Sequence, residues 1–454
     1  MTKRAFKGTG VPGPAALISL GCAKNLVDSE VLAAQIRSLG FPLTEAAEEA
    51  ELIVVNTCGF LESAVQEAVE HILDLARLKE EGGCRHLVAV GCMVQRYGRK
   101  LPDLLPEVDL FLGTSQYHRF AEIFRRFLEG SSPKVFLERP TYLVDARMPR
   151  LRSTPPHTAY VKIAEGCSNR CSFCIIPKLR GPYRSRTVED VVREARELAD
   201  EGVVEINLIA QDTTAFGSDR GEVGALIRLL EALEAVDGLR WVRLLYAYPH
   251  RIHEDLLKAM AAGDKVVPYL DIPFQHSVPR ILQAMHRVDL GRRPEEIVER
   301  IRKHLPQAAL RTSLMVGFPG ETENDFQALC RFVRDTEFDH VGVFAFSPEK
   351  GCGAASYPDQ VPDPIKEARK EALMAIQQEV SRRKLAALVG RRLPVLVEGP
   401  HPETDLLAVG RLPTQAPEVD GQVIITEGEA TVGQIVSAEI VRSHDYDLEA
   451  RLVL

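Results

Sequence analysis

The sequence predicts an α/β protein of three domains: a Rossmann-like N-terminal domain, a central partial barrel with six β-strands and crossover helices, and a small antiparallel β-barrel at the C-terminal end. Three observations predict this organisation. Short apolar runs alternate with amphipathic stretches between residues 15 and 385, as in parallel sheets with crossover helices. After residue 391 the periodicity becomes that of strands, separated by Gly, Pro and Asp. The length of 454 residues is sufficient for two to four domains.

The composition favours a cytoplasmic enzyme. Nine cysteines, an odd number without dense pairing, indicate metal or catalytic chemistry in a reducing compartment and argue against a disulfide framework. No apolar run approaches the length of a transmembrane helix, so we expect no membrane partner. The net charge of −8 argues against a surface built mainly for nucleic acid.

The N-terminal domain is expected at residues 14–130, with buried parallel strands alternating with helices. The expected strands are Ala15–Leu20, Glu51–Asn56 and His86–Val90, and the expected helices are Asp28–Leu39 and Ser63–Leu78.

A cysteine directly follows each of these three strands: Cys22, Cys58 and Cys92. Because the carboxyl ends of parallel strands form one edge of a sheet, the three thiols are expected to converge although they are far apart in the chain. Soft thiolate ligands suit an iron–sulfur cluster. The alternative is that cysteine is simply common in protein cores. Cys84 precedes its strand at the opposite edge and is expected to take no part in such a site.

A linker is expected at residues 131–156, with a short strand at Thr141–Val144. The middle domain, residues 157–387, repeats a strand–helix pattern that predicts an open barrel of six parallel strands. The expected strands are Thr158–Ala164, Val203–Ile209, Arg240–Ala247, Val266–Ile272, Arg311–Val316 and His340–Phe346.

Three helices stand out in this domain. Val188–Asp200 begins with a capping box formed by Thr187 and Asp190, and Glu254–Ala262 follows the third strand. A long helix at Asp363–Val389 is expected to bridge to the last domain. Its predicted N-cap is Asp363, Pro364 occupies the first helical position, and Gly390 ends it.

Cys167, Cys171 and Cys174 form a Cys-x3-Cys-x2-Cys motif directly after the first strand of the middle domain. Three thiolates on one loop suit a 4Fe–4S cluster that keeps one iron open. A zinc site would require a fourth ligand nearby, and the next histidine is His250. Of the remaining cysteines, Cys330 lies in a helical pattern and is expected in the core, whereas Cys352 is expected to be exposed in a loop.

This motif, with Phe173 before its last cysteine, resembles that of the radical S-adenosylmethionine (SAM) superfamily. The resemblance implies that the open iron binds the amino and carboxylate groups of SAM. One electron then cleaves SAM to a 5′-deoxyadenosyl radical. Leu314–Glu321 (LMVGFPGE) resembles the strand-five motif of the superfamily, whose backbone contacts the adenine. The expected cofactor-binding residues are Phe173, Gln211 and Gly317.

Other side chains at strand ends are expected to line the same cavity. They are Asp212, Tyr246, Asp271, Gln275 and His276. For His276, a structural role and a contact to substrate are both open.

Ser19–Glu30 (SLGCAKNLVDSE), the three strand-end cysteines and the Cys-x3-Cys-x2-Cys motif together resemble the methylthiotransferases. This resemblance implies two 4Fe–4S clusters per chain, with Cys22, Cys58 and Cys92 as the ligands of the second. It also implies that one SAM methylates a sulfur atom and that a second SAM supplies the radical for its insertion into a C–H bond. An electron donor such as flavodoxin or ferredoxin and a sulfur donor are implied as partners.

The sequence resembles, in four places, the branch that modifies an aspartate of the small-subunit ribosomal protein S-twelve. They are Cys22–Glu30, Arg180–Arg186 (RGPYRSR), Ala210–Phe216 and Leu270–His276. The alternative is the branch that modifies adenosine in tRNA. An alternative of another class is an iron–sulfur scaffold or sensor without turnover.

The last domain, residues 388–454, is expected to be a small five-stranded antiparallel barrel that resembles the TRAM module, usually an RNA-binding domain. Its eleven acidic and five arginine residues, with no lysine, give a net charge of −6. A phosphate backbone is repelled by such a field, whereas a basic protein is attracted, although net charge also serves solubility alone. The expected partner is therefore a basic ribosomal protein and not a nucleic acid. The expected strands include Leu393–Glu398, Leu406–Arg411, Gln422–Ile425 and Gln434–Val441.

Overall fold

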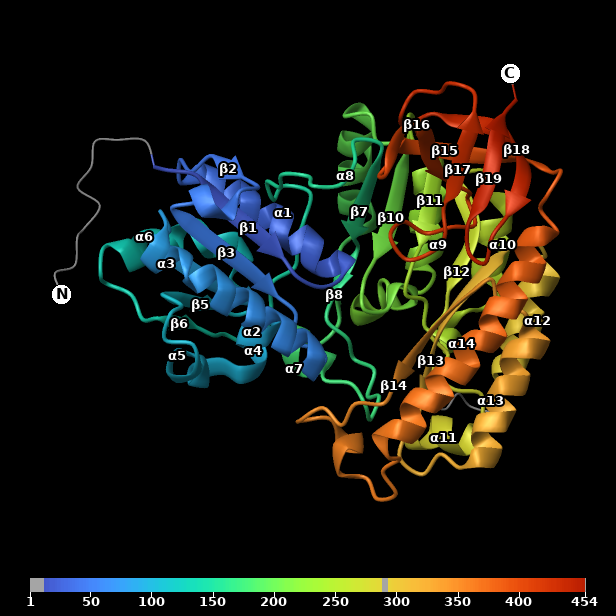
Figure 1. Cartoon of the computed structure of the whole chain (residues 1–454), viewed down its shortest axis with the longest axis horizontal. Helices are drawn as coiled ribbons and strands as arrows, with labels where there is room; N and C mark the ends of the chain where they lie inside the picture. The colour runs from blue at the N-terminus through green and yellow to red at the C-terminus, as the bar shows by residue number, and fades with distance from the viewer. Residues whose placement is uncertain (1–11, 288–292, 454) are drawn as a thin grey trace. The chain divides into compact units, whose positions relative to one another are not determined.

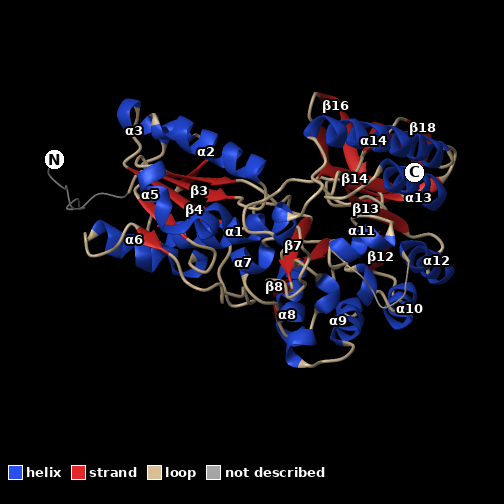
Figure 2. Ribbon diagram, turned by 90° about the horizontal axis from the view of Figure 1, so that it is seen from below, coloured by secondary structure: helices blue, strands red, loops and turns tan. Residues whose placement is uncertain are grey.

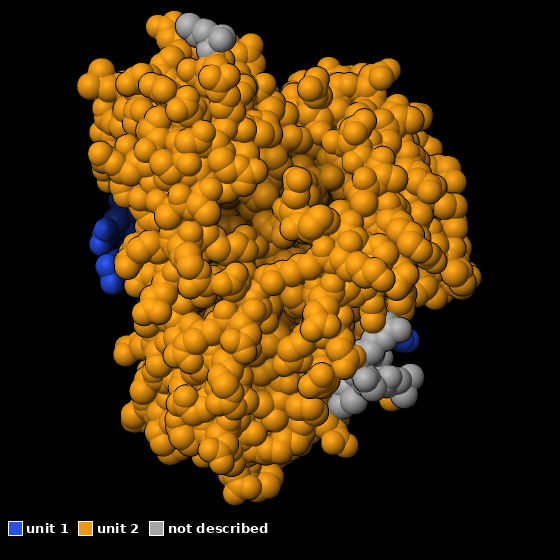
Figure 3. Space-filling model, turned by 90° about the vertical axis from the view of Figure 1, so that its right-hand side faces the viewer, with its two compact units in different colours: residues 1–153, 164–169, 174–184 blue, residues 154–163, 170–173, 185–454 orange. Residues whose placement is uncertain are grey.

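The computed structural model describes residues 12–287 and 293–453. The chain forms two compact units, coloured blue and orange in Figure 3. Unit 1 comprises the residues up to Ser153 together with Ala164–Asn169 and Cys174–Arg184, and unit 2 comprises Thr154–Ile163, Arg170–Phe173 and the residues from Ser185 onwards. Two short segments around the Cys-x3-Cys-x2-Cys motif therefore belong to the N-terminal unit.

Unit 1 contains a fully parallel sheet in the order β2-β1-β3-β4-β5-β6. The three predicted strands are present as neighbours. The other three, of two or three residues each, are too short to give a periodic pattern. The strands are β1 (Ala15–Ser19), β2 (Leu43–Thr44), β3 (Leu52–Thr57), β4 (His86–Gly91), β5 (Leu110–Leu112) and β6 (Val135–Phe136).

Helices cover both faces of this sheet, as Figure 2 shows. Val54 packs on one face with Ile36 of α1, and its neighbour Val55 packs on the other face with Ile72 of α2. This alternation of side chains along buried strands explains their uninterrupted apolar sequence. The helices are α1 (Ala23–Ser38), α2 (Glu62–Ala76), α3 (Leu78–Glu81), α4 (Cys92–Tyr97), α5 (Leu101–Leu104), α6 (Phe120–Leu128) and α7 (Ile176–Arg180).

Helix α1 begins at Ala23, five residues before the predicted start at Asp28. Its first turns bury polar side chains, including Asn25, Asp28 and Glu30, so the apolar period is hidden there. The predicted strand at Thr141–Val144 is wrong, because this segment is irregular. The amides of Thr141 and Tyr142 donate to Ser115 Oγ (2.8 and 3.3 Å) and not to a neighbouring strand.

Unit 2 contains the predicted open sheet of six parallel strands, in the order β14-β13-β12-β11-β10-β7 (Figure 1). Its strands are β7 (Thr158–Lys162), β10 (Glu205–Ile209), β11 (Trp241–Leu244), β12 (Val266–Asp271), β13 (Ala309–Val316) and β14 (His340–Ala345). The short strands β8 (Ala164–Glu165) and β9 (Arg184–Ser185) flank the loop of three cysteines in the sequence.

The helices that follow these strands have caps that only partly match the prediction. The Thr187 side chain accepts a hydrogen bond from the Asp190 amide (3.2 Å), which is half of the predicted box. The complete reciprocal box lies at Thr322 and Asp325, where the sequence reading had missed it. The helices are α8 (Val188–Asp200), α9 (Ala225–Glu234), α10 (Glu254–Ala262), α11 (Pro279–Ala284), α12 (Pro294–His304) and α13 (Glu323–Thr336).

The C-terminal part of unit 2 is a closed barrel in the order β15-β16-β17-β19-β18. The prediction that it is antiparallel is wrong at one pair, because β17 and β19 are parallel. A closed ring with an odd number of strands cannot alternate direction throughout, so one pair must be parallel. The strands are β15 (Arg392–His401), β16 (Thr404–Arg411), β17 (Val423–Glu427), β18 (Ile435–Ser443) and β19 (Leu448–Leu452).

The long helix α14 (Asp363–Ala386) leads into this barrel as predicted. Its N-cap is Pro362, so Asp363 and Pro364 lie one position further into the helix than expected. It ends three residues before the predicted Val389. Within the described ranges, no helix is long and apolar enough to cross a membrane.

The last residue of β16 and the segment that follows it contact strands β10 and β11 of the six-stranded sheet. Arg411 Nη2 lies 2.5 Å from Glu205 Oε2 at the start of β10, and Arg243 Nη1 of β11 donates to the Pro413 carbonyl (2.7 Å). Tyr269 of β12 donates to Asp420 Oδ2 (2.6 Å). The small barrel is thus joined to the sheet by buried charged and polar groups.

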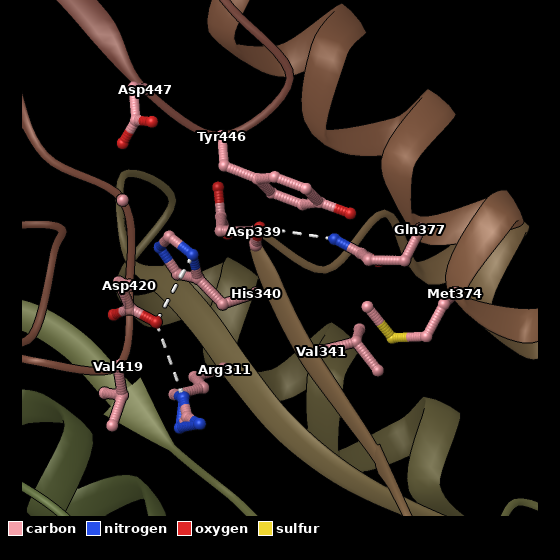
Figure 4. A pocket seen from close by; sticks show the side chains of 11 residues that line it. Arg311, Asp339, His340, Val341, Met374, Gln377, Val419, Asp420, Tyr446 and Asp447 are labelled. Carbon is pink, nitrogen blue, oxygen red and sulfur yellow. Dashed lines mark hydrogen bonds and ion pairs between the residues drawn. The ribbon is translucent and has the colours of Figure 1, made fainter. Parts of the chain in front are cut away.

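A cavity of about 350 Å³ lies beside this junction. Figure 4 shows Asp420 reaching into it between His340 and Arg311, with Asp420 Oδ1 3.4 Å from a nitrogen of each. His340 Nε2 is 3.1 Å from the Thr414 carbonyl. The polar groups on the cavity wall therefore bind one another and tie the barrel to β13 and β14.

Candidate iron–sulfur sites

The three strand-end cysteines of unit 1 lie at one edge of its sheet. Cys22 is the N-cap of α1, Cys58 directly follows β3, and Cys92 is the first residue of α4 after β4. Strands β1, β3 and β4 are adjacent and parallel, so the three cysteines leave the sheet side by side. The predicted convergence at the carboxyl edge is therefore present in the fold.

Two glycines allow the chain segments at this edge to approach one another. A Cβ placed on Gly21 would lie 3.2 Å from Cys58 Cβ, and the φ of Gly21 is +117°. A Cβ on Gly59 would lie 2.5 Å from the carbonyl carbon of Cys92. A side chain at either position would push two of the cysteines apart.

The environment of these thiols differs from one to the next. Burial raises the pKa of Cys92 to about 12, although the Arg180 guanidinium opposes this. Burial also raises the pKa of Cys58, and the nearby Cys22 adds to the rise. Cys22 is the most exposed residue of the three. Desolvation of its thiol raises the pKa, but the Lys24 charge, the neighbouring backbone amides and Arg180 have the larger combined effect, so the pKa of Cys22 is lowered.

This donor set fits an iron–sulfur cluster. Two of the thiols keep their protons because they are buried near another sulfur, and bound iron reverses this by stabilising the thiolates. Among the described residues, no group of three His, Cys, Asp or Glu side chains is arranged around a single metal ion. A cluster distributes its ligands over several irons and therefore does not need that tighter arrangement.

The Cys-x3-Cys-x2-Cys loop follows β7, as predicted, and its cysteines are divided between the two units. In unit 1, the Cys167 amide donates to the Gly181 carbonyl (3.1 Å), and Cys174 Sγ accepts from the Ile176 amide (3.4 Å). In unit 2, Cys171 Sγ accepts from Arg287 Nη1 (3.6 Å).

Arg287 also stacks on Tyr248, with its Cζ 4.4 Å from the ring centroid. Burial raises the pKa of Tyr248 to about 12; Arg287 opposes the rise and Cys171 adds to it. Cys171 thus lies between a buried guanidinium and a phenol that stays protonated at neutral pH. The sequence reading had missed both residues, since neither carries a motif of its own.

Strained backbone marks the carboxyl edge of the six-stranded sheet. Tyr246 and Gln275 have φ values of +59° and +72°, which cost on the order of 1–3 kcal/mol each in residues other than glycine. The Tyr246 amide donates to Asp271 Oδ2 (3.2 Å), and Asp212 pairs with Arg251 (3.0 Å). The buried carboxylates Asp212 and Asp271 thus each have a partner, and the strained residues Tyr246 and Gln275 are half-buried at the same edge, where strain is typical of functional sites.

The motif after β13 is built around the Glu321 carboxylate. The amides of Gly317 and Phe318 both donate to Glu321 Oε2. Any contact of Gly317 to an adenine therefore has to come from its carbonyl or Cα. His276 Nδ1 accepts from the Val278 amide (3.0 Å), and its Nε2 lies 4.0 Å from Glu321 Oε1. Among the described residues Nε2 has no hydrogen-bond partner, so a structural role and a contact to substrate both stay open for His276.

The two other predicted cofactor residues lie in different settings. Phe173 is half-buried and packs against a cluster that includes Met285, Phe318 and Phe346. Gln211 is half-buried and lies two residues after the end of β10. The structure therefore places Phe173 and Gly317 next to the same apolar cluster, since Phe318 belongs to it.

The remaining cysteines are buried. Cys84 lies before β4, and Cys330 lies in α13, as predicted. The prediction that Cys352 is exposed is wrong, because only 8% of this residue is accessible. The Ala354 amide donates to the Ser172 carbonyl (2.8 Å) and holds the loop of Cys352 against the protein.

Three family models match successive parts of the chain. Residues 15–113 match an uncharacterized protein family (UPF0004), residues 161–333 match the radical SAM superfamily, and residues 389–453 match the TRAM domain. The middle model covers the cysteine loop and the strands to β13. Radical SAM chemistry implies a 4Fe–4S cluster and SAM.

Solved structures with this fold include two other radical SAM enzymes. The methyltransferase TsrM from Kitasatospora setae matches with a TM-score of 0.54 and 17% identity over 72% of each chain. The cobalamin-dependent enzyme OxsB matches with a TM-score of 0.51 and 11% identity over 81% of this chain and 56% of its own. At these identities the likeness concerns the fold alone.

Curated relatives are similar over nearly the whole chain. A ribosomal protein uS12 methylthiotransferase RimO from Syntrophobacter fumaroxidans is 57% identical over 97% of this chain and 98% of its own. Proteins of the same name from Myxococcus xanthus and Geobacter sulfurreducens are each 47% identical, over 98% and 96% of this chain. The chain therefore belongs to the RimO family of radical SAM methylthiotransferases.

Proposed function

We propose that this protein adds a methylthio group to the β-carbon of an aspartate in ribosomal protein uS12. The observation that carries the proposal is the presence of two cysteine triplets at strand ends in a chain that is 57% identical to a RimO protein. Because ribosomal proteins are made in the cytoplasm, the proposed substrate places the reaction there.

Each domain has one proposed task. Residues 14–130 hold the cluster that handles sulfur, residues 157–387 hold SAM and the radical cluster, and residues 388–454 recruit the substrate. Residues 131–156 link the first two. The proposed ligands of the sulfur-handling cluster are Cys22, Cys58 and Cys92, and those of the radical cluster are Cys167, Cys171 and Cys174.

When bound, the two clusters and SAM supply radical formation and sulfur transfer, and the protein supplies position and exclusion of water. Arg287 and Tyr248 orient Cys171. Phe173, Gln211 and Gly317 are proposed to contact SAM. An electron donor such as flavodoxin or ferredoxin and a separate sulfur donor are proposed as partners.

Acidic residues of the C-terminal barrel are proposed to recruit the basic substrate. Glu403 in the β15–β16 turn, Asp405 near the start of β16, Glu427 at the end of β17 and Glu429 after it are all exposed. Leu406, 90% exposed, lies beside Asp405 and offers an apolar contact. This surface repels phosphate, so we propose that no nucleic acid binds there.

The test is an anaerobic reaction with reconstituted protein, SAM, dithionite and either uS12 or tRNA. We expect a methylthio group on one uS12 aspartate by mass spectrometry and no methylthio-adenosine in tRNA. Modification of tRNA in place of uS12 would establish the tRNA alternative. Absence of 5′-deoxyadenosine with either substrate would establish the scaffold alternative.

The two cysteine triplets should be separable. Changing Cys167, Cys171 and Cys174 to Ala should abolish release of 5′-deoxyadenosine while iron stays in unit 1. Changing Cys22, Cys58 and Cys92 to Ala should keep that release and abolish methylthiolation. As a matched control, Cys84→Ala should lose neither cluster, because this thiol lies at the other edge of the sheet. Loss of iron in Cys84→Ala, with full iron retained in Cys22→Ala, would overturn the assignment.

A further inference from the structure

Arg180, the last residue of α7, extends a buried guanidinium to one of the strand-end cysteines within unit 1. Its side chain is 4% exposed, and its Nε lies 3.2 Å from Cys92 Sγ. Nη1 is 2.6 Å from Asp28 Oδ2 and 3.3 Å from Glu165 Oε2, and Nη2 is 2.9 Å from Asn25 Oδ1. All three nitrogens of the guanidinium are therefore engaged.

The position of Arg180 is fixed by its own helix. Thr114 Oγ1 donates to the carbonyl of Leu179 (2.8 Å), which anchors α7 to the segment after β5. The Tyr117 ring centroid lies 6.0 Å from the Arg180 Cζ. The guanidinium cannot swing away from Cys92 without breaking buried contacts to Asp28 and Glu165, and such breaks are costly.

Charge around this guanidinium is unevenly distributed. Two carboxylates, Asp28 and Glu165, and the sulfur of Cys92 surround one cation. The Arg180 charge acts on all three strand-end cysteines. Groups that donate hydrogen bonds to ligand sulfurs, and the net charge near a cluster, set its reduction potential.

We propose that Arg180 is a positioning residue of the cluster at Cys22, Cys58 and Cys92: its Nε donates to the Cys92 sulfur, and its charge raises the reduction potential of that cluster. This inference rests on the proposed function, which places a cluster there. Reduction adds one electron and no proton, so a fixed positive charge stabilises the reduced form.

The experiment isolates this cluster in a parent protein in which Cys167, Cys171 and Cys174 are changed to Ala. Arg180→Gln and Arg180→Lys are made in that parent, and iron, sulfide and the midpoint potential are measured, the last by EPR during a dithionite titration. Arg150→Gln is the matched control, since it breaks another buried ion pair of unit 1, with Glu30 (3.0 Å), that includes no cysteine.

We expect Arg180→Gln to shift the midpoint potential to a more negative value by at least about 59 mV, a tenfold change in the one-electron equilibrium. The midpoint potential of Arg180→Lys should lie between those of the parent and of Arg180→Gln, because lysine keeps the positive charge but lacks the planar set of donors of a guanidinium. Arg150→Gln should match the parent. A folded Arg180→Gln protein that has lost its iron, beside an Arg150→Gln protein that keeps it, would also support the role.

An unchanged potential in Arg180→Gln would overturn the inference. If Arg180→Gln does not fold by circular dichroism, Arg180→Lys decides: a shifted potential supports the role and the parental value refutes it. If the parent itself holds no iron–sulfur cluster, the failure lies with the proposed cluster and not with Arg180.

Discussion

At the scale of single residues, the approach of the three strand-end cysteines in unit 1 depends on glycines beside them, which have no side chain. Gly59 follows Cys58, and its Cα faces the backbone of Cys92 and Met93. Any side chain at this position would collide with main-chain atoms, which cannot rotate away. Gly83 lies in the same unit before β4 and has no atom within 4 Å of an added Cβ.

We expect Gly59→Ala to lower the free energy of unfolding of unit 1 by about 1–3 kcal/mol, the usual cost of overpacking. It should also lower the iron bound after reconstitution, because Cys58 and Cys92 are forced apart. Gly83→Ala is the control, with an expected change between zero and a gain of about 1 kcal/mol. Urea unfolding followed by far-UV circular dichroism and iron analysis measure both effects. Equal iron in the two variants would show that the close approach is not required.

At the scale of elements, the end of β16 and the segment after it join the small barrel to the six-stranded sheet of unit 2. Glu205 lies between Arg243 and Arg411, and all three side chains are at most 3% exposed. A buried ion pair adds little to the free energy of unfolding compared with apolar side chains in place of both partners. The loss of one partner, however, leaves an unpaired buried charge, which is strongly destabilising. This junction is therefore sensitive to single substitutions.

Arg411→Met alone should destabilise unit 2 by about 3–5 kcal/mol, because Glu205 loses one of its two cations. The double variant with Glu205→Gln should recover part of that loss. Trp241, the only tryptophan, is buried at the start of β11, so its fluorescence during urea unfolding reports on unit 2. The control is Arg451→Met, which breaks an exposed pair with Glu439 and should cost at most about 1 kcal/mol. Equal costs for the two single variants would contradict a special role of the junction.

The buried Glu205 carboxylate also makes the stability of unit 2 sensitive to acid. Although burial alone raises its pKa, Arg411 and Arg243 lower the pKa of Glu205 to about 2 from a usual value of 4.5. As the pH falls, the unfolded chain takes up this proton first. The contribution of Glu205 to stability is therefore complete above pH 4.5 and is lost as the pH falls towards 2, on the order of 3 kcal/mol in all.

Between pH 6 and about pH 3.5 the free energy of unfolding of iron-free wild-type protein should thus fall more steeply than that of Glu205→Gln. Trp241 fluorescence during urea unfolding at each pH measures the two slopes. Parallel slopes would show that Glu205 does not carry this part of the acid sensitivity.

At the scale of the whole molecule, most of the net negative charge of the chain lies in its C-terminal barrel. The chain carries −8, of which residues 391–454 account for −6. Some of these acids are occupied inside unit 2: Asp445 accepts from Arg382 Nε (2.9 Å), and Asp447 accepts from the Gln422 amide (2.8 Å). The exposed Glu403, Asp405, Glu427 and Glu429 are therefore the better choice for charge reversal.

Changing these four residues to Lys should raise the KM for uS12 about tenfold or more and make it less sensitive to salt, since exposed charges are screened within about 8–10 Å at ordinary ionic strength. Release of 5′-deoxyadenosine without uS12 should stay unchanged, because the four positions lie in the barrel and not at the cysteine loop. The control carries four exposed acids of the middle domain changed to Lys, for the same change in net charge. These are Glu197, Asp200, Glu231 and Asp237. An equal effect of both sets would indicate that only net charge matters.

The amino-acid sequence was enough to predict two parallel sheets with crossover helices, the positions of both cysteine triplets and the family, but not the short strands β2, β5 and β6. These features follow from the periodicity of apolar residues and from motif spacing in the sequence. A buried strand is an uninterrupted apolar run, and a cysteine directly after such a strand lies at the carboxyl edge of the parallel sheet. Cys84 was excluded by the same reasoning, because it precedes its strand.

The side chains that surround those cysteines are brought there by packing between distant segments of the chain. Arg180 lies 88 residues from Cys92, and Arg411 lies 206 residues from Glu205, so no local pattern could pair them. The burial of Cys352 and the parallel pair β17–β19 likewise depend on packing and on closure of the barrel. Periodicity reports which face of an element is buried, but the partner of a buried charge is chosen by how the elements pack.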